Sequence, residues 1–344
     1  KSKGTEKAFQ RYLKNFGIDS DLVKLNLYAD RAVHTLRDNY EFKSVTTNGA
    51  NFNNADSNGA SVIQNSGSDG VGYIPSASLP VVDSRHTAYT LEVEVLFPRQ
   101  PSLDSGDYYE KTFLTSSIAG FHRIELSDLH TFHSSDKPLR LFVVSTENRE
   151  HSRFGLEIEE GGVSTVITSS VIPNLYDEQK WNIGVRVSDP KYPLGNLSGA
   201  VSGTAAVKPK IEFYGVHAVN NTVHKDISFS YSTTAASSQF YLTQDKKIYA
   251  GAEKTNFTGS TILFSDVVIT DVKYWQSYLT DEEIRQHAFD SETFGVLQPL
   301  ENDSIFSTNN VSVPKKDTLA LHWDFENNTQ SDTSGNFIVH DVSS

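Results

Sequence analysis

The chain has 344 residues, of which 30 are Lys or Arg and 43 are Asp or Glu, so its formal net charge is −13. This acidic balance excludes a binder that follows nucleic-acid phosphates or an anionic membrane, because both need a basic face. The absence of Cys and Met excludes disulfides, thiolate metal sites and a Cys nucleophile, and no apolar run approaches the roughly 20 residues of a membrane-spanning helix.

The first forty residues favour helix. Apolar residues recur there at helical spacing in two runs, first as Ala8, Phe9, Tyr12, Leu13 and Phe16, then as Leu22, Leu25, Leu27, Ala32, Val33 and Leu36. The spacing predicts one or two short helices across residues 5–39, within an N-terminal helical segment at 1–40. Isolated helices below roughly 12–15 residues are marginal in water, so we expect this segment to dock either on its own sandwich or on a neighbour.

From about residue 88 apolar and polar residues alternate, which is typical of half-buried strands. In Tyr89–Phe97, Leu91 and Val93 fall on one face. Glu92 and Glu94 fall on the other, which we expect to be solvated. Nine later runs share the pattern: Lys111–Ile118, Leu139–Ser145, Phe154–Glu159, Val163–Thr168, Trp181–Val187, Lys210–Val216, Asp226–Tyr231, Lys247–Ala250 and Val267–Trp275. Ten short strands with almost no helix predict a mainly β fold, a sandwich of two antiparallel sheets.

The strand block ends in a helix signal. Thr280 followed by Glu283 forms a capping box, which predicts a helix that starts there. Beyond a linker at about 296–317, Leu319–Phe325 alternates as a strand, and we expect it to pair with a neighbouring copy or a following domain rather than with its own sandwich. The predicted division of the chain is therefore 1–40, 41–295 and 296–344.

The end of the strand block carries a pattern of its own. It consists of Ile248–Ala252, Phe257–Gly259, Val267–Trp275 and Leu279–Ile284. This succession of glycine-ended strand, F-x-G, aromatic-ended strand and capped L-[ST]-x-E-E-I turn resembles the closing segment of concanavalin A-like, or laminin G-like, jelly rolls. Lys180–Val187 is similar to the Trp-led central strand of that family. The resemblance covers about residues 41–295 and implies a jelly-roll fold, not an activity.

The C-terminal strings Leu321–Glu326, Asp332–Phe337 and Asp341–Ser344 resemble the opening of another such domain. Similar strings occur in long structural proteins of marine tailed phages. The resemblance implies a non-enzymatic structural or interaction module of a virion, with other copies or other structural proteins of an assembly as partners. Two alternatives stay open: a carbohydrate-binding adhesin module at a bacterial surface or in a secreted protein, and a glycan hydrolase.

A hydrolase of this family would carry a Glu-x-Asp-x-(x)-Glu strand, because glycoside cleavage uses two carboxyl groups. The nearest string is Gly155–Gly161. Glu157 and Glu159 share a strand face in it, but the central Asp is missing and Glu160 has the wrong parity. We therefore interpret these residues as exposed edge carboxylates and expect no catalytic residue.

A histidine group offers candidate metal ligands. His122, His130 and His133 lie near Asp128 and Asp136 in the sequence. A metal site needs three or four converging ligands, and no second half of such a site appears. We expect surface or loop imidazoles here and no metal.

Two loop compositions point to other ligands. The sequence predicts no cofactor other than calcium, which would use oxygen ligands from Asp104–Asp107 or Asp332–Asn336, where ordinary Asx turns are favoured. Sugars bind to flat aromatic rings beside hydrogen-bonding acids, a composition present in Asp104, Asp107, Tyr108 and Tyr109. Tyr231 and Tyr241 flank a second Ser/Thr-rich loop of this kind.

Overall fold

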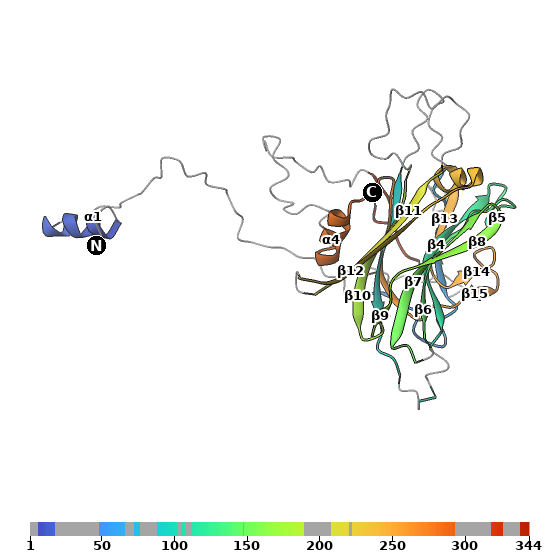
Figure 1. Cartoon of the computed structure of the whole chain (residues 1–344), viewed down its shortest axis with the longest axis horizontal. Helices are drawn as coiled ribbons and strands as arrows, with labels where there is room; N and C mark the ends of the chain where they lie inside the picture. Colours follow the sequence, from blue (N-terminus) through green and yellow to red (C-terminus); the bar gives the residue numbers. More distant parts are fainter. Residues whose placement is uncertain are drawn as a thin grey trace, which may run out of the picture. The chain divides into compact units, whose positions relative to one another are not determined.

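The computed structural model describes residues 6–17, 48–65, 72–75, 88–101, 105–106, 112–146, 148–188, 208–219, 222–292, 318–325 and 338–343. The chain divides into two compact units, residues 1–42 and 43–344 (Figure 1). No helix in this described part is long and apolar enough to cross a membrane.

The first unit contains helix α1, Glu6–Asn15, as the first apolar run predicts. Gly17 follows the helix with a φ of +77°, a left-handed conformation that glycine adopts readily at a helix end. The second helix, expected over the later apolar run, lies outside the described residues.

One sheet of the second unit has seven strands, all paired antiparallel. Their order is β1-β16-β3-β10-β11-β12, and β17 also pairs with β16. The strands are β1 Ala50–Asn51, β3 Tyr89–Phe97, β10 Gln179–Ser188, β11 Lys210–Val219, β12 Thr222–Ser232, β16 Val268–Trp275 and β17 Leu319–Asp324. We call this seven-stranded sheet sheet A.

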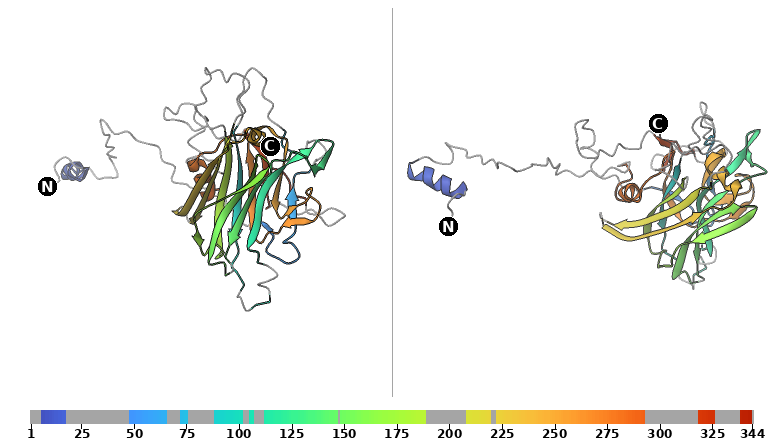
Figure 2. Two further views of the ribbon diagram at one scale, coloured as in Figure 1. Left: turned by 45° about the vertical axis from the view of Figure 1, so that its right-hand side comes forward. Right: turned by 45° about the horizontal axis from the view of Figure 1, so that its top comes forward.

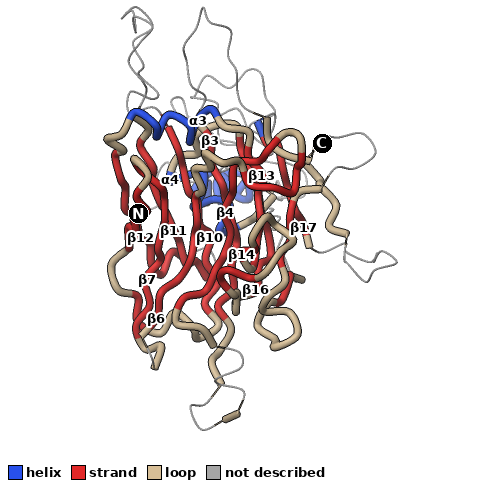
Figure 3. Tube along the Cα trace, turned by 90° about the vertical axis from the view of Figure 1, so that its right-hand side faces the viewer, coloured by secondary structure: helices blue, strands red, loops and turns tan. Residues whose placement is uncertain are grey.

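The other sheet, sheet B, has eight strands in the order β2-β13-β4-β6-β7-β8, with β5 paired to β4 and β9 to β7. The strands are β2 Ser61–Ile63, β4 Thr115–Glu125, β5 Asp128–Phe132, β6 Leu139–Ser145, β7 His151–Glu160, β8 Val163–Thr168, β9 Ile172–Pro173 and β13 Lys246–Gly251. A small separate pair joins β14 Glu253–Lys254 to β15 Thr261–Leu263. Two short helices, η1 Ala236–Gln239 and α3 Phe240–Thr243, cross one end of the sandwich (Figure 3).

The two sheets pack face to face around one apolar core (Figure 2). Trp181 of β10 is fully buried there, and its ring lies 5.3 Å from that of Phe154 on β7, centroid to centroid. Alternate side chains of each strand fill this core because the strand period is two. The predicted fold class, a mainly β, two-sheet antiparallel jelly-roll sandwich with a short N-terminal helical segment, is confirmed.

Nine of the ten predicted runs coincide with strands or lie within them to within one residue. The exception is Lys111–Ile118, because β4 continues to Glu125. Its register shifts between Ser117 and Ala119, so Ile118 and Ala119 are both buried and the two-residue period breaks. A bulge of this kind ends the visible alternation without ending the strand. The sequence also failed to indicate β5, whose side chains are mostly half-buried or exposed.

The predicted partner of the last strand was wrong. The sequence predicts that Leu319–Phe325 pairs with a neighbouring copy or a following domain, but β17 pairs with β16 of the same sandwich, with Val272 opposite Trp323. Leu321 and Trp323 point into the main core and are 3% and 4% exposed. Their burial explains the pairing, because this apolar face is covered only when the strand lies against sheet A.

Helix α4, Asp281–Phe289, starts at the predicted capping box. The Thr280 hydroxyl accepts from the Glu283 backbone N–H at 3.2 Å, and the Glu283 carboxylate accepts from the Thr280 N–H at 2.6 Å. The helix packs on β10 and β11.

We expect Thr280→Ala to lower the free energy of unfolding by about 1 kcal/mol, the usual cost of losing a Thr N-cap. Urea unfolding of the purified protein measures it, and Ser230→Ala on the exposed face of β12 is the matched control. Equal unfolding midpoints for the two variants would show that the cap does not stabilise α4.

Candidate functional site

The charged face of β3 is not solvated, contrary to the sequence interpretation. Glu92 and Glu94 are 2% and 4% exposed. Alternation correctly places both away from the core between the sheets, but His287 of α4 lies against Glu92, and Lys180 and Thr270 lie against Glu94. A local pattern of residues cannot reveal this cover, because α4 lies about 190 residues later in the chain.

Glu92 is the centre of this buried polar layer. Its carboxylate accepts from Asn182 Nδ2 at 2.7 Å, Trp275 Nε1 at 2.9 Å and His287 Nδ1 at 2.8 Å. Burial alone would raise the pKa of Glu92, yet His287, Lys273 and Asn182 hold this pKa below its ordinary value. The layer fastens α4 to sheet A.

Sheet B carries a second polar network on its outer face, and His122 of β4 lies at its centre. The imidazole is 1% exposed and stacks on Phe132 with the ring centroids 3.9 Å apart. Its Nδ1 lies 2.7 Å from Asp136 Oδ2 and its Nε2 lies 3.1 Å from Glu253 Oε1. Burial alone would lower the pKa of His122, but hydrogen bonds to the two carboxylates raise it. Each ring nitrogen thus faces a carboxylate oxygen.

The network continues across three strands through Arg140 of β6. Arg140 Nε donates to Glu253 Oε1 at 2.7 Å, and its Nη1 lies 3.3 Å from Glu157 Oε1. Register explains the second contact, because Arg140 and Glu157 are directly opposite in the β6–β7 pair. Glu157 in turn accepts from the Ser164 hydroxyl of β8. Hydrogen bonds and ion pairs thus connect polar side chains of neighbouring strands from β4 through β6 and β7 to β8.

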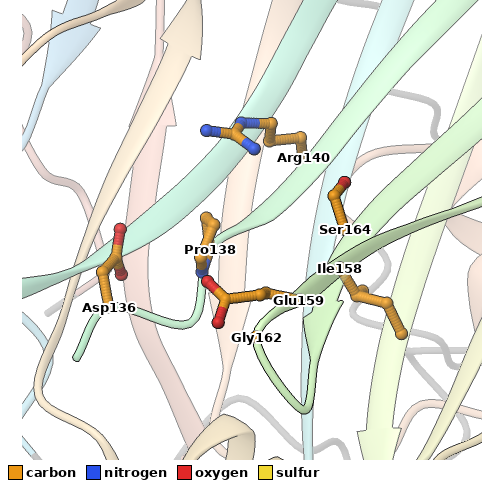
Figure 4. Close-up of a pocket in the computed structure, with 7 residues that line it drawn as sticks. All are labelled: Asp136, Pro138, Arg140, Ile158, Glu159, Gly162 and Ser164. Atoms are coloured by element: carbon orange, nitrogen blue, oxygen red, sulfur yellow. The ribbon is translucent and has the colours of Figure 1, made fainter.

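A surface pocket opens beside this network (Figure 4). Its volume is about 320 Å³. It is lined by Asp136, Pro138, Arg140, Ile158, Glu159, Gly162 and Ser164. In Figure 4 the polar groups of Asp136, Arg140, Glu159 and Ser164 surround a common space.

Tyr241 of α3 holds the backbone of two lining residues, Pro138 and Glu159. This side chain is fully buried, so it does not offer the surface ring that sequence composition suggested for sugar stacking. Its hydroxyl accepts from the Glu159 N–H at 2.6 Å and donates to the Pro138 carbonyl at 3.0 Å. Lys137 Nζ also binds Glu159 Oε1, at 2.5 Å. Pro138 and Glu159 therefore have little freedom to move.

The prediction of exposed edge carboxylates on β7 is only partly correct. Glu157 and Glu159 do share one face, but β7 lies between β6 and β8, so it is not an edge strand, and both side chains are half-buried and paired. Glu160 accepts from the hydroxyls of Tyr231 and Thr234 and from two backbone N–H groups. Although burial opposes the shift, these bonds lower the pKa of Glu160 to about 2. It fastens the end of β7 to the loop after β12.

The remaining histidine candidates do not converge on a metal. His133 Nε2 lies 3.7 Å from Glu125, and Asp128 binds the backbone N–H of His130 rather than its ring. Within the described ranges, no group of three His, Asp or Glu side chains could hold a metal ion. His122 was wrongly expected at a surface or loop.

The predicted sugar-binding residues Asp104, Asp107, Tyr108 and Tyr109 lie outside the described residues, as do most of the two candidate calcium loops. No sequence motif marks Arg140 or Ser164 of the pocket, or Lys137, which pairs with Glu159. The two carboxylates Glu157 and Glu159 indicate that cationic side chains lie nearby. The sequence does not show which ones, because Arg140 meets Glu157 through the pairing register of β6 and β7.

No family model matches the chain, and no curated protein matches it. Among solved structures it is similar to the mouse laminin alpha1 chain, domains LG4-5, with 10% sequence identity and a TM-score of 0.32. The alignment covers 70% of this chain and 47% of that solved chain, so it spans about half of the length of the two laminin domains.

Proposed function

We propose that this protein is a non-catalytic interaction module that binds a neutral glycan in the pocket between β6, β7 and β8. The observation that carries the proposal is a polar lining whose side chains are held by hydrogen bonds and ion pairs. Asp136 and Glu159 offer acceptors, Arg140 offers donors, and Ser164 offers a hydroxyl, around a space of about 320 Å³. Adjacent hydroxyls of a sugar donate to carboxylates and accept from guanidinium groups, so this set matches their chemistry. The volume lies at the lower end of the usual range for small-ligand sites.

The charge of the lining favours a neutral ligand over an anionic one. Arg140 is already paired with Glu253 and Glu157, so it does not present a free positive charge. Two further carboxylates, those of Asp136 and Glu159, line the same space. An anionic group such as a sulfate would therefore meet no cation of the lining that is free to pair with it.

Hydrolysis is the less favoured function for the same pocket. Glycoside cleavage needs one carboxyl group that holds a proton for the leaving oxygen. Asp136 is paired with the imidazole of His122, and Glu159 with Lys137. Each carboxylate has a cationic partner, which suits an acceptor better than a proton donor.

A glycan array followed by calorimetric titration tests the proposal. We expect binding to an uncharged glycan, and we expect Glu159→Gln combined with Ser164→Ala to weaken it at least tenfold, about 1.4 kcal/mol. The matched control is Glu150→Gln combined with Ser230→Ala, at two exposed positions outside the pocket. Unchanged affinity in the pocket variant would place the sugar elsewhere. Reducing-sugar release that Glu159→Gln abolishes would establish hydrolysis instead.

The setting of the module is also a proposal. We favour a virion, on the resemblance of the C-terminal strings, with a bacterial surface or secreted adhesin as the alternative. The genes that flank this one provide the test: capsid or tail genes support the virion, and secretion or surface-anchoring genes contradict it.

A further inference from the structure

Helix α1 carries three aromatic side chains on one face. Phe9, Tyr12 and Phe16 are 51%, 61% and 67% exposed. They lie at positions i, i+3 and i+7, on one side of the helix, and the rings of Tyr12 and Phe16 touch edge to face at 5.0 Å between centroids. Three large rings gathered on one surface are typical of a protein–protein contact.

The helix is too short to be stable by itself. It has 10 residues, below the roughly 12–15 at which isolated helices become marginally stable in water. Its aromatic face must therefore be covered by a partner for the helix to persist. This need is independent of the glycan pocket, which lies in the other unit of the chain.

Charge identifies the chemistry of the partner. Residues 1–17 contain five Lys or Arg and one Glu, a net charge of +4, so the other 327 residues carry a net charge of −17. A basic helix is attracted to an acidic protein. The remainder of this same sequence is such a protein.

The sandwich exposes an apolar patch that suits the aromatic face. The rings of Phe113 and Phe264 stack at 5.1 Å with an angle of 8° between their planes. Leu114, Ile262 and Phe264 are 56%, 51% and 41% exposed. We call Phe113, Leu114, Ile262 and Phe264 the Phe264 patch.

We propose that α1 of one copy docks on the Phe264 patch of a second copy of this chain. Burial of the aromatic face against the patch would supply the hydrophobic term, and the opposite net charges would add long-range attraction. Between α1 and the first sandwich strand lie residues 16–49, 34 residues whose fully extended length of about 110 Å is ample for reaching a neighbour.

Sedimentation velocity of the full chain tests this contact. We expect concentration-dependent self-association that weakens as salt is raised. Phe9→Ser, Tyr12→Ser and Phe16→Ser together should weaken it at least tenfold, and so should Leu114→Ser with Ile262→Ser in the patch. The control is Asn15→Ser, at an exposed polar position of α1. Thermal unfolding of each variant checks that the sandwich stays intact.

Mixing the helix variant with the patch variant tests whether α1 of one copy binds the Phe264 patch of another copy. The helix variant keeps an intact patch and the patch variant keeps an intact helix, so the mixture should form a heterodimer that neither variant forms alone. A mixture that stays monomeric contradicts the proposal, as does a wild-type protein that is monomeric at every concentration. A third outcome is that the wild-type protein does not self-associate but co-sediments with anionic vesicles, and that only the helix variant fails to do so. This outcome would show that α1 binds a membrane and not a second copy.

Discussion

Asp266→Ala is expected to lower the free energy of unfolding by about 3–5 kcal/mol, the usual cost of breaking a buried ion pair from one side. Asp266 is 1% exposed and Arg149, its partner, is 4% exposed. The carboxylate also accepts from the Tyr176 hydroxyl at 2.9 Å and from the Phe113 N–H at 3.1 Å. Its removal leaves a buried cation and two buried donors without their acceptor.

Chemical denaturation with fluorescence detection measures this cost. The matched control is Asp177→Ala, because Asp177 pairs with Arg99 at 3.8 Å while its side chain is 64% exposed. Exposed pairs contribute at most about 1 kcal/mol, so this variant should be close to wild type. Equal losses in the two variants would mean that Asp266 is not part of a buried pair in solution.

Lys246→Met is expected to stabilise the protein at pH 6 by about 2–4 kcal/mol. Lys246 is 2% exposed, and its Nζ lies 3.8 Å from the centre of the Tyr89 ring. Nζ donates one hydrogen bond, to the Tyr241 carbonyl at 3.1 Å, and that carbonyl also accepts from the Tyr89 hydroxyl at 2.8 Å. Met therefore removes a poorly solvated charge without leaving the carbonyl unpaired.

The pH dependence of this difference identifies its cause. Burial lowers the pKa of Lys246 from 10.5 to about 7. Below pH 7 the amine is charged in both the folded and unfolded states, and the folded state bears the full cost of burying it. Between pH 7 and 10.5 only the unfolded state holds the proton, so wild-type stability rises with pH relative to the variant. The advantage of Lys246→Met should be about 2–3 kcal/mol smaller at pH 9 than at pH 6.

Unfolding of both proteins at these two pH values is the measurement. Other groups that titrate in this range are common to both proteins, so they cancel in the difference. Lys208→Met, at an exposed position, should show no such dependence. A Lys246→Met variant that is less stable than wild type at both pH values would show that contacts with the surrounding rings outweigh the cost of burial.

The sequence by itself determined the fold class and most strand positions. Tyr89–Phe97 alternates without interruption and is a strand over the same nine residues. Thr280 and Glu283 contain the whole signal for the start of α4. These features were readable because strand period and helix capping depend on residues that are close together in the chain.

Only the tertiary structure decided which polar residues are buried and where the pocket lies. Glu92 and Glu157 have the same local pattern, a carboxylate on the outer face of a strand. One is covered by α4, and the other joins a network beside an open pocket, because different distant segments pack against their sheets. Arg140 meets Glu157 through strand register, and His122 meets Glu253 across 131 positions of the chain. Contacts of this kind follow from how the sheets assemble, and no short stretch of sequence encodes them.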